Sequence, residues 1–475
     1  MAFPNRRSLD HIPVELQDQR LPGAISGQSP DYEETLEASQ SPSVTQNERR
    51  AILIVVASFA LTFTGCGLNF AFGVYQELYE SMGGPFENVS PAAIDLIGTL
   101  AVSIMTIGAP VASSWTKAYS PRSVVLIGGL LLGLGNILAS FGNQLWHFIL
   151  TQGLLVGMGT SLSYIPAVTV SPGWFDKRRG LAMGVVSSGT GVGGVCWAPA
   201  LRALNAKIGF RNTLRLTGVV GFVMIGVAGL VLKWDPDSER RNEIEYPRNS
   251  GGFRKVRIPL VDWRIARSRT FVAQAVGATL QSAAYYTPVY FFSAYSRTLG
   301  YTAAAGANFI AASNASSAGG KVALGWFADR FGRLNTLLAC TLISAAITLG
   351  LWLPSTLTGV TESHGKGLFV AFAITYGIFA GSYISLFPTA LVEIFGVQNF
   401  ASVNGFLYMV RGFGTLAGTP AAGALIKSRS HMSISTLQAA SAYERTAILI
   451  GALLAAATLA VLWVRMEAAG TKLKA

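Results

Sequence analysis

The chain has 475 residues, of which 51% are apolar and only 13% are charged, and its mean hydropathy is +0.44. Soluble domains carry roughly 25% charged residues, so this composition excludes an ordinary soluble protein and indicates a protein embedded in a bilayer. The formal net charge is +12, but the basic residues cluster in short segments between apolar runs. That distribution is typical of membrane topology, and we expect no nucleic-acid partner.

In chain order, residues 1–47 come first; they are polar, rich in Ser, Gln, Pro and Glu, and are expected to form a disordered cytosolic tail. Apolar runs of about 20 residues follow, each long enough to cross a hydrocarbon core of ~30 Å as a helix. Helices are expected because every backbone polar group inside a bilayer must be satisfied within its own segment. The sequence predicts twelve spans, near residues 51–79, 92–116, 123–142, 146–168, 180–200, 213–232, 270–295, 303–327, 334–353, 367–390, 401–426 and 446–465.

The segment Lys233–Arg269 is polar, contains three prolines and is predicted to be a central cytosolic linker. It separates an N-terminal half, 48–232, from a C-terminal half, 270–466, and residues 467–475 form a second cytosolic tail. The predicted fold class is an all-α polytopic membrane protein with twelve transmembrane helices in two pseudo-symmetric six-helix halves. With both termini in the cytosol, 25 of the 36 Lys and Arg residues lie on the inner side, as the positive-inside rule requires. The expected location is the plasma membrane.

One stretch, Asn314–Arg333, carries the most specific motif of the chain, NASSAGGKVALGWFADRFGR. Its end resembles the loop motif G-x-x-x-D-R-x-G-R of the major facilitator superfamily. The whole stretch resembles the eighth-helix signature of the monocarboxylate-porter branch, including its fungal members, except that Lys321 stands where that branch usually has arginine. Three further segments are similar to the same branch, namely Phe72–Gln76, Trp174–Ala182 and Ile394–Ala401. The resemblance covers most of residues 50–466 and implies a transporter whose substrate site lies between its two halves.

Two cations are predicted to lie deep in the membrane. Lys321 comes eight residues before Asp329, or about 12 Å along the helix, and Arg411 lies some ten residues into the eleventh predicted span. A charge at that depth costs at least ~2.5 kcal/mol on insertion scales. No acid occurs at comparable depth in the predicted spans, so the two cations predict a receptor for a carboxylate. The alternative is that Arg411 bonds helix carbonyls, or that Lys321 extends towards the surface.

Polar side chains at helical spacing accompany both cations. Asn314, Ser317 and Lys321 share one face, and Tyr408 and Arg411 share another. Such stripes serve pore lining or interhelical hydrogen bonding, and the sequence favours neither. The residues predicted to bind substrate together with the two cations are Asn314, Ser317, Tyr408, Gln281, Tyr285 and Asn69.

Two positions depart from the pattern of the animal monocarboxylate porters. Those proteins carry an acid one turn before the eighth-helix arginine, where this chain has Ser317, and a lysine in the first span, where this chain has no base near Asn69. The resemblance implies that the missing pair couples a proton to the anion. Proton-coupled lactate transport by the same residues is therefore not expected. Facilitated diffusion, or symport that uses the substrate's own carboxylic acid, stays open.

A gate is predicted where the eighth span ends. Asp329 is expected to contact the inner end of the fifth span, through the basic residues Arg178 and Arg179 and the positive end of the helix dipole, when the cytosolic side is closed. Arg330 and Arg333 complete this gating segment and are expected to meet lipid phosphates. The alternative is that Asp329 only shapes a turn.

The predicted function is secondary transport of a small organic anion, either a monocarboxylate or a larger carboxylated or phenolic metabolite, with export of a fungal secondary metabolite included. The alternative is a non-transporting nutrient sensor of the same fold. A monomer in contact with membrane lipid is expected, and no enzyme activity, cofactor or metal. Asn88-Val89-Ser90 forms a glycosylation sequon in a short outer loop, where we expect little occupancy.

Overall fold

The computed structural model describes residues 48–80, 84–87, 89, 91–175, 177–246, 261–358, 363–426 and 440–469. The predicted tail, 1–47, and the sequon residue Asn88 lie outside these ranges. The described residues form helices joined by turns, as expected for backbone that must satisfy its own polar groups in lipid.

The N-terminal part of the described chain begins with a helical segment, Glu48–Tyr79, that contains a π-helical turn. Its helices and those that follow are η1 (Thr62–Cys66), α2 (Gly67–Phe70), α3 (Phe72–Glu80), α4 (Pro91–Ile107), α5 (Ala109–Ala118), α6 (Pro121–Ala139), α7 (Leu145–Phe148), η2 (Ile149–Leu155), α8 (Val156–Val170), η3 (Ser171–Trp174), α9 (Arg179–Ile208) and α10 (Phe210–Val231).

Two short helices, α11 (Pro236–Glu245) and α12 (Trp263–Ala266), belong to the segment predicted as a linker. The C-terminal part consists of α13 (Arg269–Thr298), α14 (Ala303–Phe331), α15 (Arg333–Ile347), η4 (Thr348–Trp352), α16 (Leu353–Thr358), α17 (Ser363–Ala424) and α19 (Glu444–Ala469).

Eight helices of the described chain are long and apolar enough to cross a membrane, or nine if the bent pair α4 and α5 forms one span. This confirms a multi-pass, all-helical membrane protein. Two long helices fall outside that set, α13 with 30 residues and α14 with 29. Both helices carry buried polar residues, among them Gln281 on α13 and Lys321 on α14, and these residues lower the mean hydropathy of the two helices.

Two helix breaks in the structure differ from the span boundaries that the sequence predicts. The predicted spans 367–390 and 401–426 belong to the single helical run α17, which is broken at Gly396, where φ is 76°. Only glycine adopts such a φ readily, which explains a sharp change of direction there without an intervening loop. The predicted second span, in contrast, bends by 44° between α4 and α5, next to Gly108.

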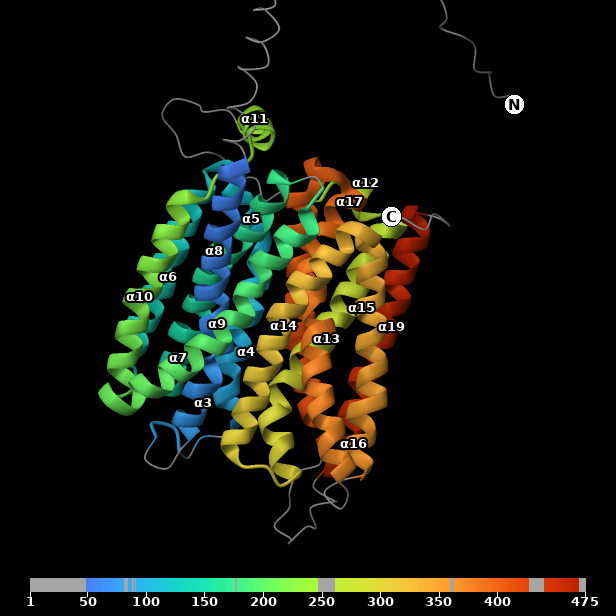
Figure 1. Ribbon diagram of the computed structural model, residues 1–475. Coiled ribbons are helices and arrows are strands. Elements are labelled where there is room, and N and C mark those ends of the chain that lie inside the picture. The colour runs from blue at the N-terminus through green and yellow to red at the C-terminus, as the bar shows by residue number, and fades with distance from the viewer. Residues whose placement is uncertain are drawn as a thin grey trace, which may run out of the picture. The chain divides into compact units, whose positions relative to one another are not determined.

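The helices pack as two groups in chain order. Within the first group α6 packs on α8 and α10, and α4 packs on α8; within the second, α17 packs on α13, α14 and α15, and α19 packs on α13 and α15. In Figure 1 the blue-to-green helices lie on one side and the yellow-to-red helices on the other, with α9 and α14 between them. The end of the bundle at which α11 lies is called the linker end below.

A cluster of basic residues at the opposite end has a local structural explanation. The guanidinium of Arg211 donates to the carbonyls of Ser140 and Gly142 and, at 2.7 Å, to Asn143 Oδ1. Arg215 Nε donates to Ser140 Oγ at 3.0 Å. Both arginines belong to the start of α10, and their guanidinium groups contact the C-terminal end of α6, where free carbonyls and the helix dipole attract cations. These arginines reduce the difference in basic residues between the two ends of the bundle. Because they have a local structural role, they do not contradict the orientation expected from the positive-inside rule.

Candidate functional site

The two groups of helices meet most closely where α9 and α14 run side by side (Figure 1). A Cβ added to Gly180 would lie 2.5 Å from the carbonyl oxygen of Gly325, and one added to Gly184 would overlap the carbonyl oxygen of Lys321. Glycine is therefore required at both α9 positions for the helix backbones to touch. This close approach brings Lys321, on α14, within reach of α9.

Lys321 is buried, with 2% of its surface exposed. Its Nζ donates to the hydroxyl Oγ1 of Thr190 at 2.6 Å and to the carbonyl of Ser187 at 3.2 Å. Both acceptors belong to α9, so the ammonium group connects the two groups of helices. The side chain points neither to lipid nor to the membrane surface.

Arg411, on α17, is also buried, with 4% exposed. Its Nε donates to Ser282 Oγ on α13 at 2.9 Å. Its guanidinium carbon lies 4.9 Å, 5.0 Å and 5.6 Å from the ring centroids of Phe387, Tyr408 and Tyr383, distances at which cation–π attraction operates. Its Nη1 is buried and has no hydrogen-bond partner among the described residues. We call these five residues the Arg411 cluster.

The Arg411 cluster is in contact with the N-terminal group of helices. The Tyr408 hydroxyl lies 3.2 Å from the Tyr164 hydroxyl on α8, and their rings meet edge to face. The Tyr383 hydroxyl is buried and, like Arg411 Nη1, has no hydrogen-bond partner in the described chain. A charged donor and a neutral hydroxyl thus lie unsatisfied in one cluster at the meeting of the two groups.

The remaining predicted substrate residues lie in the same interior but make different contacts. Gln281 is 1% exposed and its Oε1 has no partner in the described chain. Tyr285 stacks on Tyr376, with ring centroids 6.4 Å apart. Asn69 donates to Thr160 Oγ1 at 3.4 Å, a contact within the N-terminal group.

Asn314 and Ser317 are both buried on α14, on the face that carries Lys321. A Cβ added to Gly194 would lie 3.0 Å from the amide nitrogen of Asn314, which places that amide against α9. A Cβ added to Gly381 would overlap the Ser317 hydroxyl, which places that hydroxyl against α17. The polar face of α14 that carries these residues is therefore packed between α9 and α17.

Asp329 lies against the start of α9. Its two carboxylate oxygens accept hydrogen bonds from the backbone N–H groups of Gly180 and Leu181, both at 2.8 Å. Arg333 Nη2 lies 3.2 Å from the same carboxylate. An acid at a helix N-terminus satisfies free N–H groups and interacts favourably with the dipole. The N-terminal end of α9 therefore binds the Asp329 carboxylate through backbone N–H groups.

The other basic residues of the predicted gating segment make the following contacts. Arg178 is exposed, whereas Arg179 is buried and its Nε donates to the carbonyl of Pro172 at 2.9 Å. Arg330 is exposed, and its guanidinium carbon lies 3.9 Å from the centroid of the Trp326 indole. In the described chain the direct contacts of Asp329 are thus with the backbone of α9 and with Arg333.

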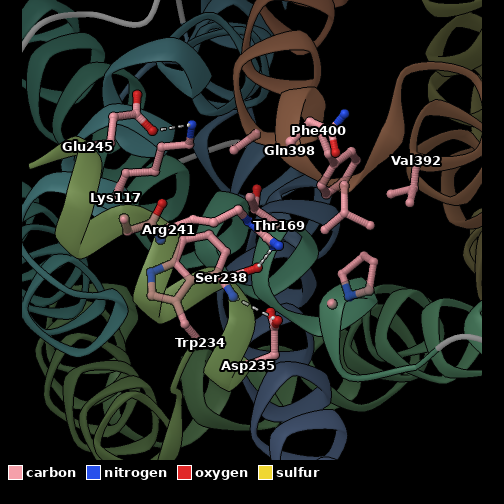
Figure 2. A pocket seen from close by; sticks show the side chains of 15 residues that line it. Lys117, Thr169, Trp234, Asp235, Ser238, Arg241, Glu245, Val392, Gln398 and Phe400 are labelled. Carbon is pink, nitrogen blue, oxygen red and sulfur yellow. Dashed lines mark hydrogen bonds and ion pairs between the residues drawn. The ribbon is translucent and has the colours of Figure 1, made fainter. Parts of the chain in front are cut away.

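A cavity of about 140 Å³ lies at the linker end, in a place the sequence did not indicate (Figure 2). On one side is α11, whose Glu245 pairs with Lys117 of α5 at 3.5 Å. The other side is formed by residues of α17, among them Phe400. The signal that could have located α11 is Asp235-Pro236, an N-cap acid followed by proline; Asp235 accepts from the backbone N–H of Ser238 at 3.0 Å. Lys321 and Arg411 are not among the residues that line this cavity.

Comparisons with known proteins agree with this architecture. The family model described as Major Facilitator Superfamily matches residues 54–365. The agnestins efflux protein AgnL12 of Paecilomyces divaricatus is 27% identical over 85% of this chain and 87% of its own length. The MFS transporter asaE of Aspergillus flavus is 24% identical over 98% of this chain and 97% of its own. Monocarboxylate transporter 11 of Homo sapiens is 29% identical over 78% and 76%. The chain therefore belongs to the Major Facilitator Superfamily and is a multi-pass transporter of small molecules, not an enzyme.

Proposed function

We propose that this transporter carries a small organic anion, and that Arg411 binds the anionic group. The observation that supports the proposal is the Nη1 group of Arg411, which is buried at the meeting of the two helix groups without a protein partner. A charged donor left unpaired in a low-dielectric interior is costly. A carboxylate supplied by the cargo removes that cost and forms a charge-assisted hydrogen bond.

The Arg411 cluster also favours a particular shape of anion. Three aromatic rings surround the guanidinium, and the unpartnered hydroxyl of Tyr383 provides a second donor beside Nη1. Planar apolar surface next to two donors suits a carboxylated or phenolic metabolite at least as well as a short monocarboxylate. Relatives of both kinds support the proposal, since they include a protein named for efflux of agnestins and proteins named monocarboxylate transporters. Export is the direction that we propose.

The membrane arrangement that accompanies this function is also a proposal. Twelve spans in two six-helix halves, 48–232 and 270–466, are obtained when the bent pair α4 and α5 counts as one span, when α17 is divided at Gly396 and when α13 and α14 count as spans. We place the linker end and both termini in the cytosol and the protein in the plasma membrane as a monomer. Charge supports this orientation, because 25 of the 36 basic residues then lie on the inner side.

The experiment is a counterflow screen in proteoliposomes with carboxylic acids and aromatic metabolites at two pH values. Saturable exchange of at least one anion is expected, and Arg411→Gln should abolish it. Arg267→Gln is the matched control, since Arg267 is exposed and stacks on Trp263 away from the cluster. Good exchange of neutral compounds that Arg411→Gln leaves unchanged would overturn the anion proposal. Lack of any flux by a folded protein would instead favour a sensor.

A further inference from the structure

We infer that Lys321 is a positioning residue that holds the two halves together at the centre of the molecule, and that it is not the group that anchors the cargo. This departs from the sequence-based expectation that both buried cations bind the carboxylate of the cargo. The inference rests on transport by alternating access between two halves. It does not depend on which substrate is carried.

The Lys321 ammonium already has protein partners, and they lie across the boundary between the halves. Nζ has three N–H donors and directs two of them to α9, at 2.6 Å to Thr190 Oγ1 and at 3.2 Å to the carbonyl of Ser187. The Thr190 hydroxyl donates its own proton to the Ser187 carbonyl at 2.8 Å. The hydroxyl oxygen is thus left as an acceptor for the ammonium. We call this three-residue group the Lys321 clasp.

Packing against two glycines holds Lys321 in this position. The carbonyl of Lys321 lies against Gly184, with no room for a side chain there. On its other side the stem passes Gly381 of α17, where an added Cβ would be 3.7 Å from Cε. Between these two glycines the ammonium can reach α9 without displacing either helix.

Lysine also fits the α9 partners better than arginine does. An ammonium is a compact point donor, and it suits one hydroxyl and one helix carbonyl on adjacent turns. A guanidinium presents a planar fork that prefers a bidentate carboxylate, which α9 does not offer at Ser187 and Thr190. The residue type therefore fits the partners present on α9 better than it fits a free anion.

A mechanical consequence follows for the closed linker end. Opening that end separates the start of α9 from the end of α14, which breaks the Asp329 contacts with the backbone of Gly180 and Leu181. The Lys321 clasp lies about 12 Å deeper along α14, so it must break as the opening propagates to the centre. The closed form is thus held at two levels, and the deeper level is the clasp.

The test measures how readily the linker end opens when no substrate is present. Ala401 lines the cavity at that end and is 5% exposed, so Ala401→Cys provides a thiol that reacts with a membrane-impermeant maleimide mainly when the end opens. Thr190→Val removes one acceptor and leaves the ammonium buried with a single partner. The labelling rate should rise roughly tenfold, which is the change expected when a hydrogen bond to a buried charge is lost.

A double-mutant cycle makes the test specific to the clasp. In a Lys321→Met background, Thr190→Val should change labelling by less than about twofold, because there is no ammonium left to satisfy. Thr341→Val is the control, since within the described chain that hydroxyl bonds carbonyls of its own helix alone, those of Leu337 and Leu338. The chain without Ala401→Cys corrects for the native cysteines.

The inference is overturned if Thr190→Val leaves the labelling rate unchanged in the chain that keeps Lys321. It is also overturned if Thr190→Val changes the rate equally in that chain and in the Lys321→Met chain. Lys321→Arg keeps a positive charge for the cargo but not the clasp geometry. The inference is also overturned if the labelling rate of this variant is no higher than that of the chain with Lys321. Because labelling needs no substrate, failure here leaves the role of Arg411 standing. Failure of the Arg411→Gln exchange test likewise leaves the clasp standing.

Discussion

Two seams join the halves of this protein, and they are built differently. In the first seam α9 meets α14 through backbone contact at glycines, and its charged residues Asp329 and Lys321 have hydrogen-bond partners on the opposite helix. In the second seam α4 and α5 meet α17, which carries Arg411, and several polar atoms there have no partner in the described chain. Those atoms are Ser113 Oγ, Asn404 Oδ1 and Arg411 Nη1.

The difference between the seams separates a structural role from a binding role. Buried polar groups that bond one another fix the relative position of two helices. Buried polar groups without partners require water or a ligand. Accordingly, we expect the α9–α14 seam to hold the halves together and the α17 seam to bind the cargo. Changes in the first should alter opening, and changes in the second should alter affinity.

The largest effect is expected from Arg411→Lys in the second seam. The shorter ammonium loses the Nε bond to Ser282 and the stacking on three rings, and its donors no longer reach the position of Nη1. Loss of a buried charge-assisted contact costs about 2–5 kcal/mol, so exchange of the best substrate from the screen should fall by roughly thirtyfold or more. Concentration dependence of counterflow measures this, with Arg267→Lys as control. Retention of wild-type exchange would contradict a cargo-binding role for the guanidinium.

The next effect is expected from Gly184→Val in the first seam. The added carbons would overlap the backbone carbonyl of Lys321, so α9 and α14 must separate. Overpacking of this kind costs about 1–3 kcal/mol, and both thermal stability and closure of the linker end should decrease. Thermal unfolding in detergent and labelling at Ala401→Cys measure the two effects. Gly319→Val is the matched control on α14, because nothing lies within 4 Å of its Cβ position.

A smaller effect is expected from Asp329→Asn at the end of the same seam. The amide keeps one acceptor for Gly180 or Leu181 but loses the charge that favours the α9 N-terminus. A loss of about 1–2 kcal/mol in closure of the linker end is expected. Labelling at Ala401→Cys measures it, with the exposed Asp237→Asn as control.

The partner of Asp329 can be identified in the same assay. Because the carboxylate contacts backbone N–H groups, exchanging the charges of Asp329 and Arg179 should not restore closure. Full restoration by that double change would show that the basic side chain, and not the helix end, is the partner.

The smallest effects are expected from removing the hydroxyl groups of two tyrosines in the Arg411 cluster, and the two variants should differ from each other. Tyr408→Phe removes a hydroxyl that contacts Tyr164 across the seam, and should lower the free energy of unfolding by about 1 kcal/mol. Tyr383→Phe removes a hydroxyl that has no partner in the described chain, so stability should be unchanged while the substrate concentration at half-maximal exchange rises. Thermal unfolding and counterflow separate the two. Equal behaviour of the two variants would remove Tyr383 from the proposed site.

Local pattern was sufficient for part of this site. The depth of Lys321 and Arg411 follows from their distance to the ends of apolar runs, and both side chains are buried. The attraction of Asp329 to a helix N-terminus follows from its motif and from the dipole. The sequence could not assign different roles to the two cations, however, because their partners are distant in the chain: Thr190 lies 131 positions from Lys321, and Ser282 lies 129 positions from Arg411.

By itself the sequence determined the helical membrane class and the family, since span length, hydropathy and the motif ending at Arg333 are local properties. Only the tertiary structure decided which helix backbones touch, that α17 continues to a break at Gly396, and that α11 borders a cavity at the linker end. The physical reason is that apolar periodicity indicates that a face is buried but does not identify its partner. The partner depends on close packing between distant helices, where the presence or absence of one Cβ decides whether an ammonium reaches a hydroxyl.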